Sequence, residues 1–273
     1  RCLSGAGSCH CGLPVPRIYT SIGDPWFWSR TWRRRLQTTL LLRQIDLVTV
    51  LSPRAAQAVA DCWRVSPAKI RITGNGRDPD DFRPPEPEER ARARVELGLL
   101  SDGPTVVTLG ALSREKRPLL AIAAINRLPG VTLLVAGDGP LRAEAEKAAA
   151  ANPLIRILGP CADVVPILHA ADALLLTSET EGLPGVLIEA GLTGLPCVTT
   201  RTGFVSDVVK DGETGVVVAD PTPDELATGV RKVLDLHHEM SCASRQHCVA
   251  HFSIHDVRRR WLELLRQTAT LRD

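Results

Sequence analysis

The sequence predicts an α/β protein with parallel sheets, and two observations lead to this class. From residue 104 onward, short β-branched runs alternate with helical stretches, which is typical of a parallel sheet with helices on both faces. Roughly the first 85 residues show the same alternation with fewer segments. The length of 273 residues fits one large domain or two small ones. We therefore expect two lobes of the same class.

The longer of these two regions defines a nearly complete lobe. Its strands are expected at 104–110, 131–137, 154–159, 173–178, 196–200 and 215–219. Its helices are expected at 117–127, from the turn at 137–140 up to residue 151, at 163–171 and at 184–192. Sheets of this kind bind ligands at the carboxyl ends of their strands, where loops meet helix N-termini.

The region before it contains less of the pattern. Strands are expected at 16–23, 45–52 and 69–73, with an arginine-rich helix at about 29–44. Ser52 and Pro53 form an N-cap and a first-turn proline for a further helix. The proline-rich, charged stretch 82–90 predicts an interdomain linker. Three strands are fewer than the usual five or so, so we expect the beginning of this lobe to be missing.

Composition excludes several classes of function. The net charge is only +2, which argues against a dedicated nucleic-acid binder. No apolar run approaches the ~18 residues that span a bilayer. The eight cysteines are scattered, which favours a reducing compartment and hence the cytoplasm.

Two clusters of cysteine and histidine could suggest a metal. They are Cys9-His10-Cys11 with Cys2, and the histidine-rich stretch 237–255. Neither has the paired C-x-x-C spacing of a structural zinc site. A polar helix and loop with solvated imidazoles is the favoured interpretation of the second cluster.

Two carboxylates are the most informative feature of the chain. Glu181 ends a loop after a strand, and Glu189 lies in the first turns of the next helix, with seven residues between them. The intervening turn includes Gly182, Leu183, Pro184, Gly185 and Val186, whose amides can face a ligand. A helix N-terminus suits phosphate, and a nearby carboxylate accepts hydrogen bonds from vicinal hydroxyls. This layout fits a nucleotide-sugar, whereas the alternative is a solvated loop residue and a helix-dipole charge. A glycosidase pair, which flanks its bond from two sides, does not fit.

Several segments, taken in order, resemble one family. The segment TEGLPGVLIEAGLTGLPCVTT looks like the signature of retaining glycosyltransferases of the GT-B fold, family 4. The other matching segments are LVTVLSPRAAQAV, KIRITGNGRDPDDFRP, VVTLGALSREKRPLLAIAAI, LLVAGDGPLR, IRILGPCADV, HAADALLLTSETEG and DVVKDGETGVVVAD. The resemblance covers nearly the whole chain and implies two Rossmann-like lobes. Residues 1–84 would be the acceptor lobe, 85–252 the donor lobe, and 253–273 a helix that crosses back.

The resemblance also implies roles for single residues. Glu181 is similar to the glutamate that contacts the donor sugar, and Glu189 to the one that holds the ribose hydroxyls. Lys116 stands at the lysine that binds the donor diphosphate and offsets charge on the leaving group. The family's usual arginine after the strand glycine is Ala111 here, so Arg114 or Arg117 is a candidate replacement.

Two glycine turns belong to the same implied site. Gly137 to Gly139 and Gly159 to Asp163 border the nucleotide pocket in such proteins, although simple turn chemistry explains them equally well. Gly137 and Gly139 also resemble a dinucleotide fingerprint, but Arg142 occupies its third glycine position, which argues against a nicotinamide site.

Other positions depart from the family or imitate another one. Gly23 stands where many relatives have histidine, and Gly203-Phe204 replaces a frequent Gly-Gly pair, which leaves the type of acceptor open. Asp78-Pro79-Asp80 has the form of a metal motif of the other glycosyltransferase fold. Its position after an Asn-Gly turn favours turn formation instead.

A basic stretch in the first lobe suggests a membrane contact. Residues 30–43, from Arg30 to Arg43, hold five arginines and no acid, and tryptophans precede and interrupt them. Such a helix could lie on an anionic membrane at its inner face. The alternative, a helix packed on the sheet with a solvated arginine face, is the favoured interpretation.

Together these inferences predict a hexosyltransferase that retains anomeric configuration and needs no metal or cofactor. It would move a sugar from a nucleotide-diphosphate-sugar donor to a hydroxyl acceptor of a glycan, lipid or small molecule, with no nucleic-acid partner. The alternative is a nucleotide-sugar binding module or an inactive relative. A sugar-nucleotide epimerase of similar fold lacks support because its motifs differ.

Overall fold

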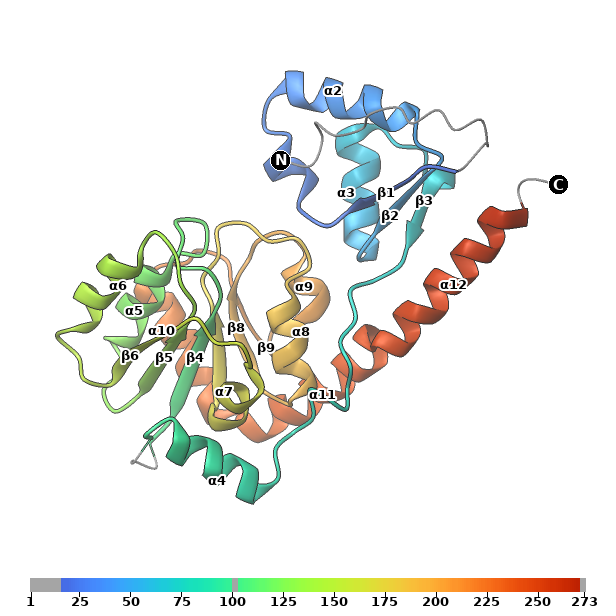
Figure 1. Cartoon of the computed structure of the whole chain (residues 1–273). Helices are drawn as coiled ribbons and strands as arrows, with labels where there is room; N and C mark the ends of the chain where they lie inside the picture. Colours follow the sequence, from blue (N-terminus) through green and yellow to red (C-terminus); the bar gives the residue numbers. More distant parts are fainter. Residues whose placement is uncertain (1–15, 100–102, 271–273) are drawn as a thin grey trace.

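The computed structural model describes residues 16–99 and 103–270, which form two parallel sheets in separate lobes (Figure 1). The Cys9-His10-Cys11 cluster lies outside the described residues. The first sheet has the order β1-β2-β3, with strands Ile18–Ser21, Leu47–Val50 and Ile70–Ile72. The second has the order β6-β5-β4-β7-β8-β9, with strands Ile155–Gly159, Thr132–Ala136, Thr105–Leu109, Ala173–Leu176, Cys197–Thr200 and Gly215–Val218. The predicted class, α/β with parallel sheets, is confirmed.

Three α-helices accompany the first sheet. They are α1 (Pro25–Trp28), α2 (Trp32–Arg43) and α3 (Pro53–Trp63), and a short 3₁₀ turn, η1 (Pro67–Lys69), precedes β3. The Ser52 side chain accepts a hydrogen bond from the Ala55 N–H at 3.2 Å, which confirms the predicted N-cap. Helix α3 packs its apolar face, including Val59, on Val48 and Val50 of β2.

The second sheet lies between two helical layers. Alternate residues of each strand face opposite sides of the sheet, so each layer covers one set of them. Val106, Leu133 and Leu175 belong to the core beneath α5 (Pro118–Ile125), α6 (Arg142–Ala149) and α10 (Pro223–Asp235). Val107 and Leu134 belong to the opposite core, with α7 (Val165–Ala170), α8 (Gly185–Leu192), α9 (Val205–Val208) and α11 (His237–Phe252).

Two segments differ from the sequence-based expectation. The linker predicted at 82–90 is correct only in its first half, because α4 (Pro87–Glu96) begins inside it. Glu86 and Glu89 form a capping box there, so local helix-start signals outweigh the proline-rich composition. Helix α10 was not predicted, although Thr222 caps it and Pro223 occupies its first turn.

The histidine-rich stretch is also more ordered than predicted. Residues 237–252 form the continuous helix α11, which packs along α8. His247 is half-buried and its Nε2 lies 3.0 Å from the carbonyl oxygen of Asp207, and burial lowers the pKa of this imidazole. The expected helix is confirmed, but the interpretation of solvated imidazoles is wrong for His247, because α11 packs on α8 and this ring meets Asp207 of α9.

The chain passes between the lobes at two places that lie side by side. The Arg77 N–H donates to the Phe252 carbonyl at 3.0 Å, and the Ile254 N–H donates to the Arg77 carbonyl at 2.9 Å. Gly76 is required here, because a Cβ at that position would lie 2.8 Å from the Ile254 Cα. From this crossing, α12 (Ile254–Thr270) extends back beside the first lobe (Figure 1). No helix in the described ranges is long and apolar enough to cross a membrane.

Candidate functional site

A cleft of about 1110 Å³ separates the two lobes at the carboxyl ends of their strands. The first lobe contributes residues 19–24, from β1 and the loop that follows it, together with parts of α1 and α2. The second lobe contributes Glu115 and Lys116 from the loop after β4, and residues 180–182 from the loop after β7. Strands β4 and β7 are neighbours in the sheet, so their following loops meet at one point of the cleft wall.

Lys116 and Glu181 form an ion pair at this point. The Lys116 ammonium donates to Glu181 Oε1 at 2.6 Å, across 65 residues of sequence. The Glu181 side chain is 9% exposed and that of Lys116 is 35% exposed, so the carboxylate is mostly desolvated whereas the cation remains accessible. A charge-assisted hydrogen bond of this length fixes both groups. The structure thus brings together two of the residues that the sequence predicts for the site.

Two glycines hold the Glu181 loop in place. A Cβ on Gly182 would lie 1.9 Å from the Ile22 carbonyl oxygen of the first lobe, so only glycine allows the two backbones to meet there. A Cβ on Gly203 would lie 1.7 Å from the Glu181 carbonyl oxygen, and its φ of 48° also favours glycine. Close backbone packing therefore sets the position of Glu181 from both sides.

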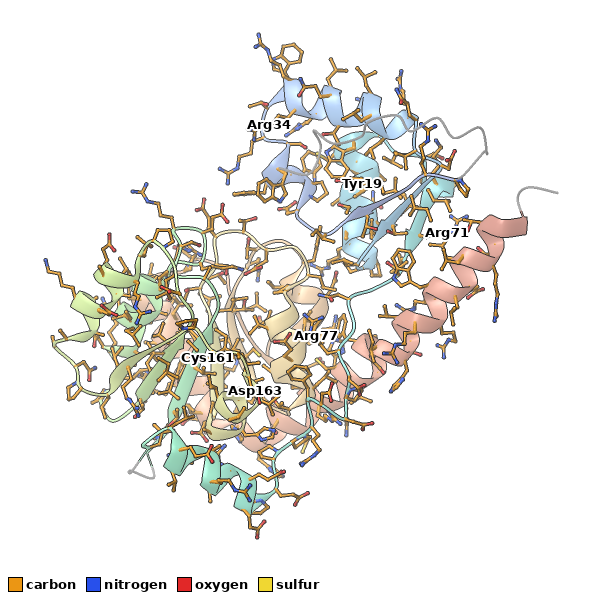
Figure 2. The ribbon with its side chains drawn as sticks, in the orientation of Figure 1. Tyr19, Arg34, Arg71, Arg77, Cys161 and Asp163 are labelled. Atoms are coloured by element: carbon orange, nitrogen blue, oxygen red, sulfur yellow. The ribbon has the colours of Figure 1, made fainter. Side chains whose placement is uncertain are left out.

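Glu189 is paired with a different cation, which the sequence analysis does not identify. Its Oε1 accepts from Arg77 Nε at 2.6 Å, and the guanidinium also donates through Nη1 to Asn75 Oδ1 at 3.0 Å. Asn75 in turn donates to the Leu183 carbonyl at 3.1 Å. Figure 2 shows Arg77 beside α8. Nothing in the local sequence pattern points to this pair, because its members are 112 positions apart.

The turn between the two glutamates contributes backbone rather than side chains. Helix α8 begins at Gly185, with Pro184 as its N-cap residue. Leu183 is buried and Val186 is partly buried, and both pack on the apolar core. A Cβ on Gly185 would lie 2.2 Å from Arg77 Nη2, so the glycine makes room for the guanidinium over the start of α8.

The predicted glycine turn after β5 allows two loops to pack closely through their backbones. A Cβ on Gly137 would lie 1.8 Å from the Gly110 carbonyl oxygen, and one on Gly139 would lie 2.7 Å from the Leu112 carbonyl oxygen. The loops after β4 and β5 can therefore touch through their backbones, as the Leu112 N–H to Asp138 carbonyl bond of 2.9 Å shows.

Two further predicted residues lie apart from the ion pairs. Arg114 is exposed on the loop after β4, and Asp163 Oδ1 accepts from the Val165 N–H at 2.9 Å at the start of α7. Figure 2 shows Asp163 and Cys161 near α7. Among the described residues, no hydrogen bond joins Arg114 or Asp163 to Lys116 or Glu181.

The structure explains one departure from the family pattern and one motif that imitates another fold. A Cβ on Gly23 would lie 2.5 Å from Trp28 Nε1, so the indole ring occupies the space that a histidine side chain needs. Asp78 Oδ1 accepts from the Asp80 N–H at 3.0 Å, which is the turn that the sequence predicts. Within the described ranges, no group of three or more His, Cys, Asp or Glu side chains could hold a metal ion.

Comparisons with known proteins first define the class. HepE from Anabaena, solved in complex with UDP, superposes with a TM-score of 0.83 at 21% identity, over 92% of this chain and 72% of that one. Sucrose-phosphate synthase from Thermosynechococcus elongatus superposes with a TM-score of 0.80 at 23% identity, over 93% of this chain and 68% of that one. The fold is therefore of the GT-B class.

The family follows from the sequence. The family described as "Glycosyl transferases group 1" matches residues 89–247, more than half of the chain, and the protein belongs to this family. A GDP-mannose-dependent alpha-(1-6)-phosphatidylinositol monomannoside mannosyltransferase from Mycolicibacterium smegmatis is 31% identical over 76% of this chain and 58% of its own length. A D-inositol 3-phosphate glycosyltransferase from Mycobacterium marinum is 29% identical over 70% of this chain and 42% of its own length. The chain thus spans about half the length of these relatives.

Proposed function

We propose that the protein acts as a retaining glycosyltransferase, which moves a sugar from a nucleotide-diphosphate-sugar donor to a hydroxyl acceptor. The observation that carries the proposal is the Lys116–Glu181 pair, held at 2.6 Å in the wall of the cleft between the lobes. Membership of the group 1 family supports the reaction class. HepE structures with UDP and with UDP-glucose support a nucleotide-sugar as donor.

Each charged group has a role in this proposal. The Lys116 ammonium offsets the charge that develops on the leaving diphosphate, and the buried Glu181 carboxylate holds that ammonium and meets the donor sugar. Glu189 Oε1 is engaged by Arg77, and its other oxygen accepts from the ribose hydroxyls. The amides at the start of α8 face the phosphates. Lysine and amides supply the positive field, so the proposal needs no divalent metal.

The proposal divides the chain as the resemblance implies. Residues 1–84 hold the acceptor, residues 85–252 hold the donor, and residues 253–273 return to the first lobe. The acceptor hydroxyl enters from the wall formed by residues 19–24, Trp28 and α2. Retention of the anomeric configuration is proposed on the resemblance of Glu181 to the first glutamate of the retaining family.

We further place the protein in the cytoplasm, with peripheral contact to an anionic membrane through α2. Trp32 and Leu36 lie four residues apart on this helix, outside the lining of the cleft, and are 70% and 49% exposed beside the arginines of the same helix. Binding to vesicles of phosphatidylglycerol but not phosphatidylcholine, weakened in Trp32→Glu, tests the contact. Equal binding to both, or to neither, would contradict it.

Calorimetry with a panel of nucleotides tests the reaction class. UDP, GDP and ADP are titrated first, and the sugar donor of the best binder is then supplied with water as acceptor. We expect one nucleoside diphosphate to bind clearly better than the others, and the released sugar to appear first as the α-anomer by NMR. Failure to bind any of the three would overturn the proposal. Binding without release would leave the chain a nucleotide-sugar binding module.

A further inference from the structure

Arg117 follows the catalytic-lysine candidate and has an unusual backbone. Its φ and ψ are 50° and 54°, a left-handed conformation that, among the described non-glycine residues, only Arg64 shares. This conformation is costly for a residue with a Cβ and persists where the surroundings hold it. The side chain of Arg117 is partly buried, and burial lowers its pKa. The residue is therefore held in place by strong interactions.

Those interactions are hydrogen bonds to the two residues that follow β7. Arg117 Nε donates to the Thr177 carbonyl at 2.6 Å, and Nη2 donates to the Ser178 carbonyl at 2.8 Å. Both carbonyls lie on the segment that leads to Glu181. The planar guanidinium reaches two acceptors at once, which a lysine ammonium on a flexible stem cannot match in geometry.

Residues 177–179 also donate hydrogen bonds to carbonyl oxygens of residues 115–117. Thr177 Oγ1 lies within hydrogen-bond distance of two carbonyl oxygens, 2.9 Å from that of Lys116 and 3.0 Å from that of Arg117. The Glu179 N–H donates to the Glu115 carbonyl at 2.7 Å. Residues 115–117 and 177–179 are thus joined by bonds in both directions.

We propose that Arg117 is a positioning residue, whose guanidinium fixes the Lys116 loop on the Glu181 loop and so holds the Lys116 ammonium at Glu181. The consequence for turnover rests on the proposed function. Arg117 does not replace the family's missing diphosphate arginine, because Nε and Nη2 are both engaged by backbone carbonyls. It acts on the donor only through Lys116.

Trace acetylation of the full chain tests the positioning without any donor. An ammonium in an ion pair reacts slowly, so a displaced Lys116 reacts faster, which mass spectrometry of the Lys116 peptide measures. Arg117→Lys keeps the positive charge but loses the planar guanidinium that reaches two acceptors. Arg117→Gly removes the charge and the guanidinium, and it also removes the strain of a left-handed backbone. We expect the rate to rise at least threefold in Arg117→Gly and by a smaller factor in Arg117→Lys. Arg64→Gly, which removes an exposed arginine at φ 54°, is the matched control and should leave the rate unchanged.

Turnover of the donor tests the consequence. Because Lys116 acts on charge that develops in the transition state, kcat should fall at least tenfold in Arg117→Gly, while KM for the donor changes less than threefold. A raised KM at constant kcat would show direct contact with the donor and overturn the inference. So would an unchanged acetylation rate in both variants, or a rate altered in Arg117→Gly alone, which would indicate a charge effect. A wild-type chain that binds no nucleotide would defeat the proposed function only, since acetylation still decides the positioning.

Discussion

The two carboxylate–cation pairs of the site have the same length and different origins. Lys116–Glu181 and Arg77–Glu189 each span 2.6 Å, and in each pair the carboxylate is the more buried partner. The first pair joins loops after the neighbouring strands β4 and β7 of one sheet. The second joins α8 to the segment between β3 and α4 that leaves the other lobe.

The first pair is thus positioned within one lobe, and the second is positioned by the junction, which is the segment around Arg77 where the chain passes between the lobes. Lys116 and Glu181 lie on loops of one lobe that follow neighbouring strands, whose register is set by buried pairs such as Val107 and Leu174. Gly182, next to Glu181, also meets Ile22 of the other lobe. The geometry of Arg77 and Glu189 depends on how the junction lies on α8. The geometry of the first pair should therefore change little when the lobes move, whereas the geometry of the second pair depends on how the lobes are arranged. Four predictions break or sharpen this comparison.

The largest effect is expected from Lys116→Met. Removing a cation that stabilises a leaving group lowers kcat by roughly 10²–10³-fold. Donor hydrolysis or transfer, followed by NMR, measures the change. Lys147→Met makes the same substitution on the exposed face of α6 and should leave the rate unchanged. Turnover within threefold of wild type would remove Lys116 from the reaction.

The next effect concerns Glu189→Ala and nucleotide affinity. Loss of a charged acceptor for the ribose hydroxyls costs about 1.5–3 kcal/mol, or roughly 10–150-fold in Kd. Calorimetry should show this loss for the preferred nucleoside diphosphate and little further loss for its 2′,3′-dideoxy form. Glu144→Ala, on the exposed surface of α6, is the control. Equal losses for both nucleotides would show that Glu189 does not bind ribose.

A smaller effect is expected from Arg77→Met, which leaves Glu189 in place but removes its partner. A partly exposed ion pair contributes about 0.5–1 kcal/mol, so we expect a Kd that is roughly two- to fivefold weaker. The same change should lower Tm by about 1–4 °C in a chain of this size. A loss as large as that of Glu189→Ala would mean that the two residues act as one unit, which would contradict the comparison.

The smallest effect is expected from removing divalent ions. Each pair brings its own cation, so excess chelator should change donor binding and turnover by less than about twofold. The measurement compares chelated protein with protein supplied with Mg²⁺ or Mn²⁺. Activity that strictly requires either ion, together with loss of that response to metal in Asp80→Asn, would show that the Asp78-Pro79-Asp80 turn binds metal.

Local patterns predicted much of the fold, because alternating β-branched runs and helix caps depend on neighbours in sequence. The strands of the second lobe and the Ser52 cap follow from such signals. Helix α4 was hidden within a proline-rich stretch, although its capping box at Glu86 and Glu89 was present. The high proline content of that stretch masks its helix-start signal in the sequence.

The site was only partly predictable for a different reason. The spacing of Glu181 and Glu189 around a helix start indicates the site, whereas Lys116 is implied only by the family resemblance. The Lys116–Glu181 contact follows once strands β4 and β7 are neighbours. Arg77 and Arg117 were not assigned their contacts, because each acts through a tertiary bond to a group at least 60 residues away. Such bonds leave no periodic pattern in the chain.

The two side-by-side crossings give the molecule a double-stranded pivot. The two crossing segments are hydrogen-bonded to each other, as Arg77 is to Phe252 and Ile254. Such a pair of segments resists twisting and sliding, so we expect bending about one axis to be the easiest motion between the lobes. Points near a pivot travel least when the arms swing. Arg77 is part of the pivot and holds Glu189, whereas the Gly182–Ile22 contact lies on the opposing arms. Opening the cleft would therefore part the rim at Gly182 while the end at Glu189 stays nearly still. Under the proposed function, a donor would remain anchored at Glu189 as the opposite wall of the cleft moves away.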